Sequence, residues 1–107
     1  MTGIGRLRER VVLEAPVESD DGAGGVVRTY ATQATLWAEI IAVSAKGALV
    51  ADAAGASVTH RITIRSGVDV TMRHRFRLGA RIFEIVSMRD ADPQGRLMLI
   101  EARERVD

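Results

Sequence analysis

Few residue types in this sequence could do chemistry, and its two histidines are the first candidates. His60 lies in VTHRITIRS and His74 in TMRHRFRLG, each on the apolar face of an alternating stretch. A zinc site would need carboxylate partners at matching places, because a chain without cysteine has no thiolate to offer. The sequence signals no such partners. We therefore expect both histidines to be packed, hydrogen-bonded core residues, and no metal or cofactor to be bound.

Two acidic stretches resemble fragments of calcium-binding loops. They are DDG at positions 20–22 and DAD at positions 90–92, and neither continues into the alternating oxygen ligands that end in glutamate. The glycines at 22, 24 and 25 lack the Lys-Ser/Thr pair of a phosphate-binding loop. No serine has the setting of a nucleophile elbow. Turn formation explains both acidic stretches, and we expect the protein not to be an enzyme.

The arginines form the third group, because alternate positions collect them on strand faces. Two expected strands carry such faces: Arg73, Arg75 and Arg77 on one, and Arg61 and Arg65 on the other. Guanidinium groups placed in this way can meet water, acidic side chains of a neighbouring subunit, or DNA phosphates. Binding to bases would normally add exposed aromatic rings, whereas Phe76 and Phe83 fall at positions expected to be buried. A solvated or subunit-facing role is therefore favoured over direct base contact.

The composition fits one small domain over residues 1–107. Hydrophobic residues make up 47% of the 107 positions and charged residues 27%, as in a globular protein. Fifteen basic and fourteen acidic side chains leave a net charge of +1, without the basic excess usual for nucleic-acid-binding domains. No apolar run approaches the roughly 20 residues that span a membrane, and no signal peptide is evident. We expect a cytoplasmic protein that is stabilised by neighbouring subunits.

The elements that position these residues are predicted to be strands. Alternating or β-rich stretches occur at 10–15, 26–30, 34–43, 58–66, 72–78, 81–88 and 96–105. In 34–43, Trp37 and Ile41 make the second face apolar as well, which indicates a central strand or one covered by a partner. The predicted fold is mainly β: a small antiparallel β-barrel or sandwich of about six to seven strands, with one short helix or loop insertion.

Turns and insertions separate these strands. Pro16 is expected to end the first strand, because proline cannot donate to a strand ladder. Glu18–Gly25 is expected to form a mobile, glycine-rich loop, and Gly79-Ala80 a two-residue hairpin turn. Ser44–Ala56 is rich in alanine and is predicted to form a short helix or a loop that orders against a partner.

The ordered motifs of the chain resemble one family. The stretches IGRLRERVVLEAPVES, DDGAGGVVRTYATQATLWAEI, VTHRITIRSGVDVTMRHRFRLGARIFEIVSM and GRLMLIEARE are similar in order and spacing to the small head–tail joining proteins of tailed bacteriophages. These are also called head-closure, stopper or adaptor proteins, and they occur in gene transfer agents. The segment SAKGALVADAAGA departs from the family, whose members often carry a more polar segment there.

The resemblance implies a structural protein that forms a six- or twelvefold homo-oligomeric ring. Such a ring lies in the neck of the particle, with the portal or an adaptor on the head side and tail proteins on the other. It extends the DNA channel, lies close to double-stranded DNA without reading its sequence, retains that DNA and docks the tail. Assembly would take place in the bacterial cytoplasm, with no membrane involved. A tail terminator-like ring protein and a free nucleic-acid-binding β-barrel remain alternatives.

Two sets of residues are the candidates for these contacts. The candidates for the ring interface or the lumen are the five arginines of the polar faces: Arg61, Arg65, Arg73, Arg75 and Arg77. The candidates for portal or tail contacts, or for gating, lie in the two predicted loops: Asp20, Asp21, Gly22, Gly24, Gly25, Lys46, Leu49, Val50 and Asp52. Segments rich in small residues on a rigid β scaffold commonly carry binding.

Overall fold

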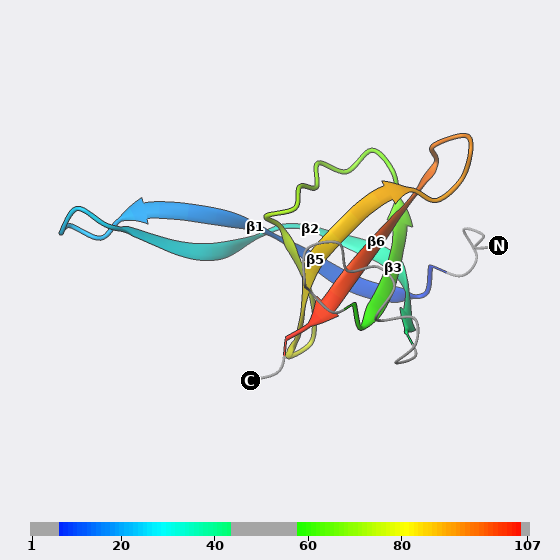
Figure 1. Cartoon of the computed structure of the whole chain (residues 1–107), viewed down its shortest axis with the longest axis horizontal. Helices are drawn as coiled ribbons and strands as arrows, with labels where there is room; N and C mark the ends of the chain where they lie inside the picture. Colours follow the sequence, from blue (N-terminus) through cyan, green and yellow to red (C-terminus); the bar gives the residue numbers. More distant parts are fainter. Residues whose placement is uncertain (1–6, 44–57, 106–107) are drawn as a thin grey trace.

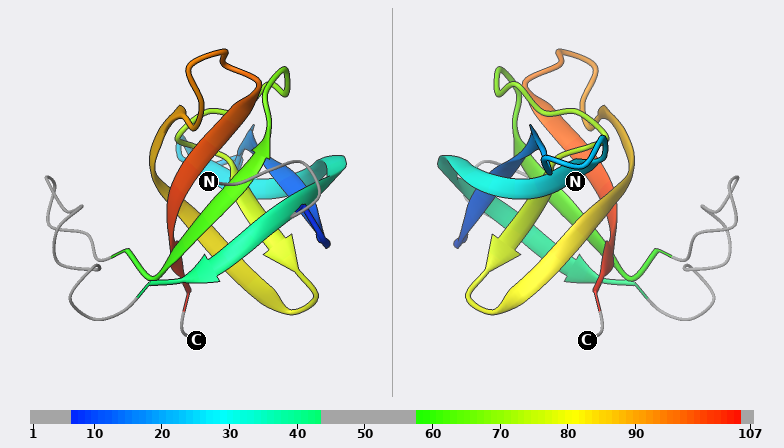
Figure 2. Two further views of the ribbon diagram at one scale, coloured as in Figure 1. Left: turned by 90° about the vertical axis from the view of Figure 1, so that its right-hand side faces the viewer. Right: turned by 90° about the vertical axis from the view of Figure 1, so that its left-hand side faces the viewer.

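The strands of this protein close into a small barrel, seen in a computed structural model that describes residues 7–43 and 58–105. The described residues contain six strands and no helix: β1 (Glu9–Asp20), β2 (Val26–Ala42), β3 (His60–Arg65), β4 (Arg75–Leu78), β5 (Arg81–Asp90) and β6 (Leu97–Glu104). Every neighbouring pair is antiparallel, in the closed order β1-β2-β3-β6-β5-β4 (Figure 1). The end-on views of Figure 2 show the strands arranged around a common interior. The predicted antiparallel β fold is confirmed, as a barrel rather than a sandwich.

Alternate side chains along the strands point inward and fill the barrel interior. The largest fully buried side chains come from five of the strands and from Val58: Phe76, Phe83, Leu13, Ile62, Ile64, Ile100, Val11 and Val58. In β3, Ile62 and Ile64 are buried whereas Arg61 and Arg65 are exposed, as the period-two pattern predicted. The β4–β5 hairpin turns at Gly79-Ala80, with Leu78 paired to Arg81, so that predicted turn is also confirmed.

The first strand continues through Pro16, so the prediction that it ends there is wrong. Pro16 pairs with Tyr30 of β2, and the two predicted strands at 26–30 and 34–43 are the single strand β2. On its other edge, β1 pairs with β4 only at Val12–Glu14. Beyond Glu14, this edge of β1 has no strand partner among the described residues. Pro16 is tolerated there because no hydrogen bond from its backbone nitrogen is needed on an unpaired edge.

Past the barrel, β1 and β2 continue as a two-stranded projection, residues 15–32, which we call the arm (Figure 1). The register shifts where the arm begins: Leu13 pairs with Ala34 but Glu14 pairs with Thr32, so Gln33 is an extra residue. Such a bulge bends a strand and increases its twist. The predicted loop at 18–25 is therefore shorter than expected, because residues 18–20 belong to β1.

The segment before β4 also differs from its prediction. Residues 71–74 form a turn in which the His74 amide donates to the carbonyl of Thr71 at 3.1 Å, and β4 begins only at Arg75. Strict alternation over 72–78 would place Met72 on the same inward face as Phe76, yet Met72 is 50% exposed. Alternation within a strand cannot place a side chain that lies in a turn.

The core assignment predicts unequal effects of two truncations. We expect Phe76→Ala to lower the free energy of unfolding by about 3–5 kcal/mol, because it removes a fully buried ring and leaves a cavity. Met72→Ala is the control and should change it by less than about 0.5 kcal/mol. Urea unfolding followed by circular dichroism measures both. Similar losses for the two variants would contradict the inward position of Phe76.

Candidate functional site

His74 is a buried structural residue held by Thr71 and Gln33. Its Nδ1 accepts a hydrogen bond from the Thr71 amide at 3.1 Å and lies 2.9 Å from the Thr71 hydroxyl. This leaves Nε2 to donate to Oε1 of Gln33, 2.9 Å away. The Gln33 amide nitrogen donates in turn to the carbonyl oxygen of Asp69 at 2.8 Å. The bulge in β2 thus positions a glutamine that ties the segment before β4 to the base of the arm.

His60 is only partly buried and has a different setting. Its ring meets Phe83 edge-on with 5.0 Å between ring centroids, and Nδ1 lies 2.9 Å from the Thr59 hydroxyl. Burial lowers the pKa of His60, and nearby Glu104 opposes that shift while Arg81 adds to it. Among the residues that the structure describes, no group of three or more His, Cys, Asp or Glu could hold a metal ion. His74 is buried as the sequence predicted, whereas His60 lies at the edge of the core.

The acidic stretches form turns. The Asp20 carboxylate accepts the Gly22 amide at 2.8 Å, and Asp21 accepts the amides of Ala23 and Gly25 at 2.7 and 2.9 Å. These backbone hydrogen bonds lower the pKa of Asp21, so its charge is held at the tip of the arm. Asp92 accepts the Arg96 amide at 2.8 Å in the β5–β6 turn. The turn interpretation is confirmed in both places.

A single carboxylate neutralises part of the predicted arginine face. Glu14 of β1 accepts Arg75 Nε at 2.6 Å on one oxygen and Arg77 Nε at 2.9 Å on the other. The Arg75 guanidinium also stacks over the Tyr30 ring, 3.8 Å from its centroid. Two of the three arginines are therefore engaged within the chain itself, while Arg73 is exposed.

The pKa of Glu14 records this arrangement. Burial raises the pKa, but hydrogen bonds and the charges of Arg75 and Arg77 outweigh it, so the pKa lies below the ordinary value. A second carboxylate, Glu101 of β6, is buried in a similar cluster with Arg89 at 3.1 Å and Arg61 at 3.7 Å, and its pKa is also lowered. Both clusters lie across strand pairs and tie neighbouring strands together.

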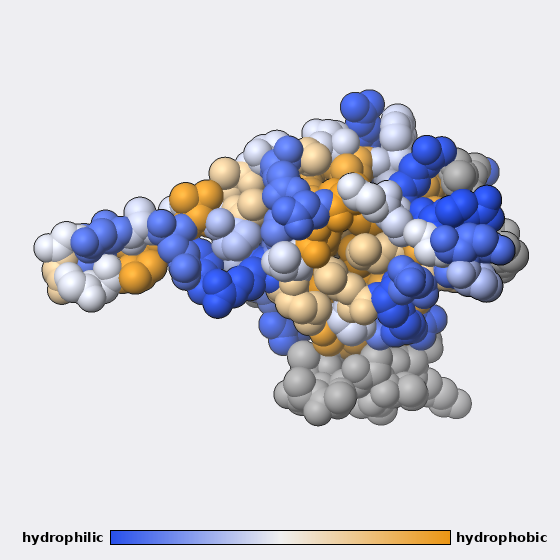
Figure 3. All heavy atoms as spheres, turned by 90° about the horizontal axis from the view of Figure 1, so that it is seen from above, coloured by the Kyte–Doolittle hydropathy of each residue, from blue (hydrophilic) through white to orange (hydrophobic). Residues whose placement is uncertain are grey.

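The arm presents apolar and acidic side chains to solvent. Val17, Val26 and Val27 are 44%, 67% and 45% exposed. Glu18 is paired with Arg28 at 2.8 Å, whereas Asp20 and Asp21 have no cationic partner within residues 7–43 and 58–105. Seen from above, the arm shows separate apolar spots among its polar side chains (Figure 3).

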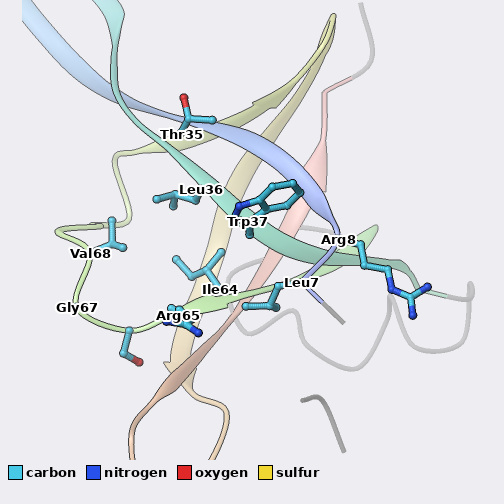
Figure 4. A pocket seen from close by; sticks show the side chains of 10 residues that line it. Leu7, Arg8, Thr35, Leu36, Trp37, Ile64, Arg65, Gly67 and Val68 are labelled. Carbon is cyan, nitrogen blue, oxygen red and sulfur yellow. The ribbon is translucent and has the colours of Figure 1, made fainter. Parts of the chain in front are cut away.

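A pocket of about 770 Å³ opens at one end of the barrel, where β2 and β3 separate. The last residue pair that joins them here is Ala38–Ile64. Arg65 keeps its pairing with Leu97 of β6 on the other edge of β3 but pairs with no residue of β2. Its lining is mostly apolar, with two arginines and three small residues: Leu7, Leu36, Trp37, Ile64 and Val68, then Arg8, Arg65, Thr35, Ser66 and Gly67. Leu36, Ile64 and Val68 lie around a common space (Figure 4).

The predicted site residues are thus separated in space. Asp20, Asp21, Gly22, Gly24 and Gly25 share the turn of the arm, with Gly22 and Gly24 at φ of 81° and 86°. The five arginines are divided between β3 and the β4 region. The predictions for Lys46, Leu49, Val50 and Asp52 concern residues outside the described part of the chain.

Three features were missed in the sequence. Glu14 was not identified as the partner of two arginines, and Gln33 was not identified as a bulge. Both residues lie near the register shift between β1 and β2, where strict alternation of buried and exposed side chains fails. At this shift two consecutive residues, Leu13 and Glu14, are both buried. The pocket depends on where two strands part, which no local pattern encodes. One indication of the pocket was visible in the sequence, the apolar second face predicted for 34–43. Trp37 of that face is 53% exposed.

The Glu14 cluster predicts a pH-dependent stability. A lowered pKa in the folded state stabilises the protein above the ordinary value of 4.5, and this contribution is lost as the pH falls below it. Glu14→Gln should cost about 1.5–3 kcal/mol at pH 7 and reduce the loss of stability in acid. Urea unfolding between pH 3 and pH 7 tests this.

The exposed pair of Glu84 and Arg103, 2.7 Å apart, provides a matched control. Glu84→Gln should cost at most about 1 kcal/mol. Equal costs for the two variants, or an unchanged acid response in Glu14→Gln, would contradict the proposed role of Glu14.

The structure is similar to a chain from the virion of a native gene transfer agent particle, with a TM-score of 0.70 and 33% identity over 92% of this chain and 94% of that one. It is also similar to a protein of Shigella flexneri 2a solved in solution, with a TM-score of 0.75 and 30% identity over 96% of each chain. No curated protein matches the sequence.

The sequence also matches the family described as phage head completion protein, over residues 3–105. The match spans all six strands. The predicted resemblance to head–tail joining proteins, gene transfer agent homologues included, is thereby confirmed. The chain belongs to the phage head completion protein family.

Proposed function

We propose that this protein forms a closed ring in the neck of a phage or gene transfer agent particle, between the portal side of the head and the tail. Family membership and the likeness to a virion chain support a structural head–tail joining role. In the proposed ring, of six or twelve copies, the subunits continue the DNA channel, help to retain packaged DNA and offer a docking face to tail proteins. Assembly in the bacterial cytoplasm is part of the same proposal.

The arm is the observation that carries the proposal. Among the described residues, residues 16–30 of the arm pair only with one another, because β3 and β4 join β2 and β1 within the barrel. A two-stranded ribbon is marginally stable in water without a further packing surface. Exposed valines on such a ribbon gain stability when another surface covers them. A neighbouring subunit in a ring would supply that surface to every copy.

Ring geometry also gives the remaining arginines a proposed role. Subunits in a cyclic ring contact each other through two different faces, so one face must complement another. Arg65 and Arg73 have exposed side chains, and neither has an ion pair with another described residue. They are the better candidates for the interface or for a lumen that passes DNA, since Arg75 and Arg77 already share Glu14.

Shortening the arm tests the proposal. Replacing residues 17–29 with Asn-Gly keeps the Pro16–Tyr30 pair and closes it with a favoured two-residue turn. We expect the barrel to keep its strand content and thermal transition, because the strand pairs of the barrel are retained. Ring assembly, measured by native mass spectrometry or light scattering, should be lost. Particles that carry the variant should fail to join tails or retain DNA.

Two outcomes would contradict this proposal. One is a shortened-arm protein that still forms rings and supports complete particles. The other is an intact protein that stays monomeric in every condition and binds oligonucleotides in a salt-sensitive manner, which would favour a free nucleic-acid-binding barrel.

A further inference from the structure

We propose that the arm of one copy seats in the pocket of the next copy, with its acidic turn beside Arg65. The inference rests on the proposed ring and names the contact that would hold it together. It joins two surfaces of the same chain, the arm and the pocket, that no other strand of the described residues covers.

The pocket has the features of a protein-binding surface. Its apolar floor includes Leu36, Ile64 and Val68, and Trp37 beside it is half exposed. The Arg10 guanidinium lies 5.0 Å from the centroid of the Trp37 ring and holds it from one side. Tryptophan and arginine are enriched among the residues that contribute most to protein interfaces. A cover over this pocket would remove exposed apolar surface from water.

The arm has matching chemistry. Val17 and Val27 lie on one face of the ribbon, because the pairs Val17–Thr29 and Ser19–Val27 are two residues apart on each strand. Asp20 and Asp21 place negative charge at the end of that ribbon. A face with two exposed valines and an acidic end therefore complements an apolar pocket with Arg65 at its edge.

Charge supports the same pairing. Arg65 has no acidic partner, and the aspartates of the turn have no cationic one, within residues 7–43 and 58–105. Unpaired charges of opposite sign on two surfaces favour association and fix its register. Other charged side chains, such as Glu14 and Arg75, are already in ion pairs within the barrel, whereas Arg65, Asp20 and Asp21 can pair with a neighbouring copy.

The arm cannot reach the pocket of its own barrel. The ten-residue offset between Val26 and Leu36 in β2 corresponds to about 30 Å of extended strand. The arm also runs away from the barrel (Figure 1). The occupant must therefore be another copy. Such a contact joins two different surfaces, and repeating it generates a closed ring when the rotation between subunits allows it.

Cross-linking provides the direct test, because the chain contains no cysteine of its own. Val27→Cys with Val68→Cys puts one thiol on the arm and one in the pocket. In assembled protein, oxidation or a short bismaleimide should produce a ladder of covalent multimers on a denaturing gel. The control pairs Val27→Cys with Gln94→Cys in the exposed β5–β6 turn, and it should give no ladder.

The outcomes separate this inference from the proposed ring. Rings that form without a ladder above the control overturn the arm-in-pocket contact and leave the ring proposal intact. Absence of any oligomer, both in solution and in particles, overturns both. A ladder that appears only after portal or tail protein is added would still support the contact, because both thiols belong to copies of this chain.

A charge exchange independently tests whether the acidic turn of the arm lies beside Arg65 of the next copy. Arg65→Glu should weaken assembly about tenfold, because it places a negative charge beside the acidic turn. Adding Asp20→Arg in the same chain should restore it. Trp37 is the only tryptophan, so its fluorescence should shift to shorter wavelength on assembly of the native and double-variant proteins. An unchanged emission spectrum, or a double variant that assembles no better than Arg65→Glu, would overturn the contact.

Discussion

The seam between β1 and β4 is the constraint on which the rest of the structure depends. Only three residue pairs join these strands, at Val12, Leu13 and Glu14, yet they close the barrel. Leu13 faces Phe76 inside, and Glu14 binds two arginines of β4 outside. Apolar burial and a doubly paired carboxylate thus reinforce the shortest junction of the barrel. A buried carboxylate without such partners would cost free energy, so Glu14 and the arginines depend on one another.

The arm begins where this seam ends. The register shift beside Glu14 makes Gln33 an extra residue, and its side chain reaches the segment that leads into β4 through His74. The base of the arm is therefore fixed to the barrel by hydrogen bonds as well as by strand pairing. A base anchored in this way gives the arm a defined direction, which a projecting element needs if it is to meet the same place on every neighbour.

Periodicity was enough to predict the barrel class, the buried isoleucines of β3 and the Gly79-Ala80 turn, because each depends on neighbours along the chain. It failed at Pro16 and Met72, where the outcome depends on which strand edge is free and where a turn ends. The arginine stripe was visible, but Glu14 lies about sixty residues away in sequence, and only the closed barrel brings it beside Arg75. The pocket near Trp37 similarly results from how β2 and β3 separate, although the apolar outer face gave a partial signal.

A reconstruction of the particle neck by electron cryomicroscopy tests the central claim most directly. The account predicts a closed ring of this chain between portal and tail, with the arm of each copy lying over Trp37 of its neighbour. A neck that lacks this chain would contradict the head–tail joining role. A ring whose arms extend into solvent, away from every neighbouring subunit, would contradict the view that the arm holds the assembly together.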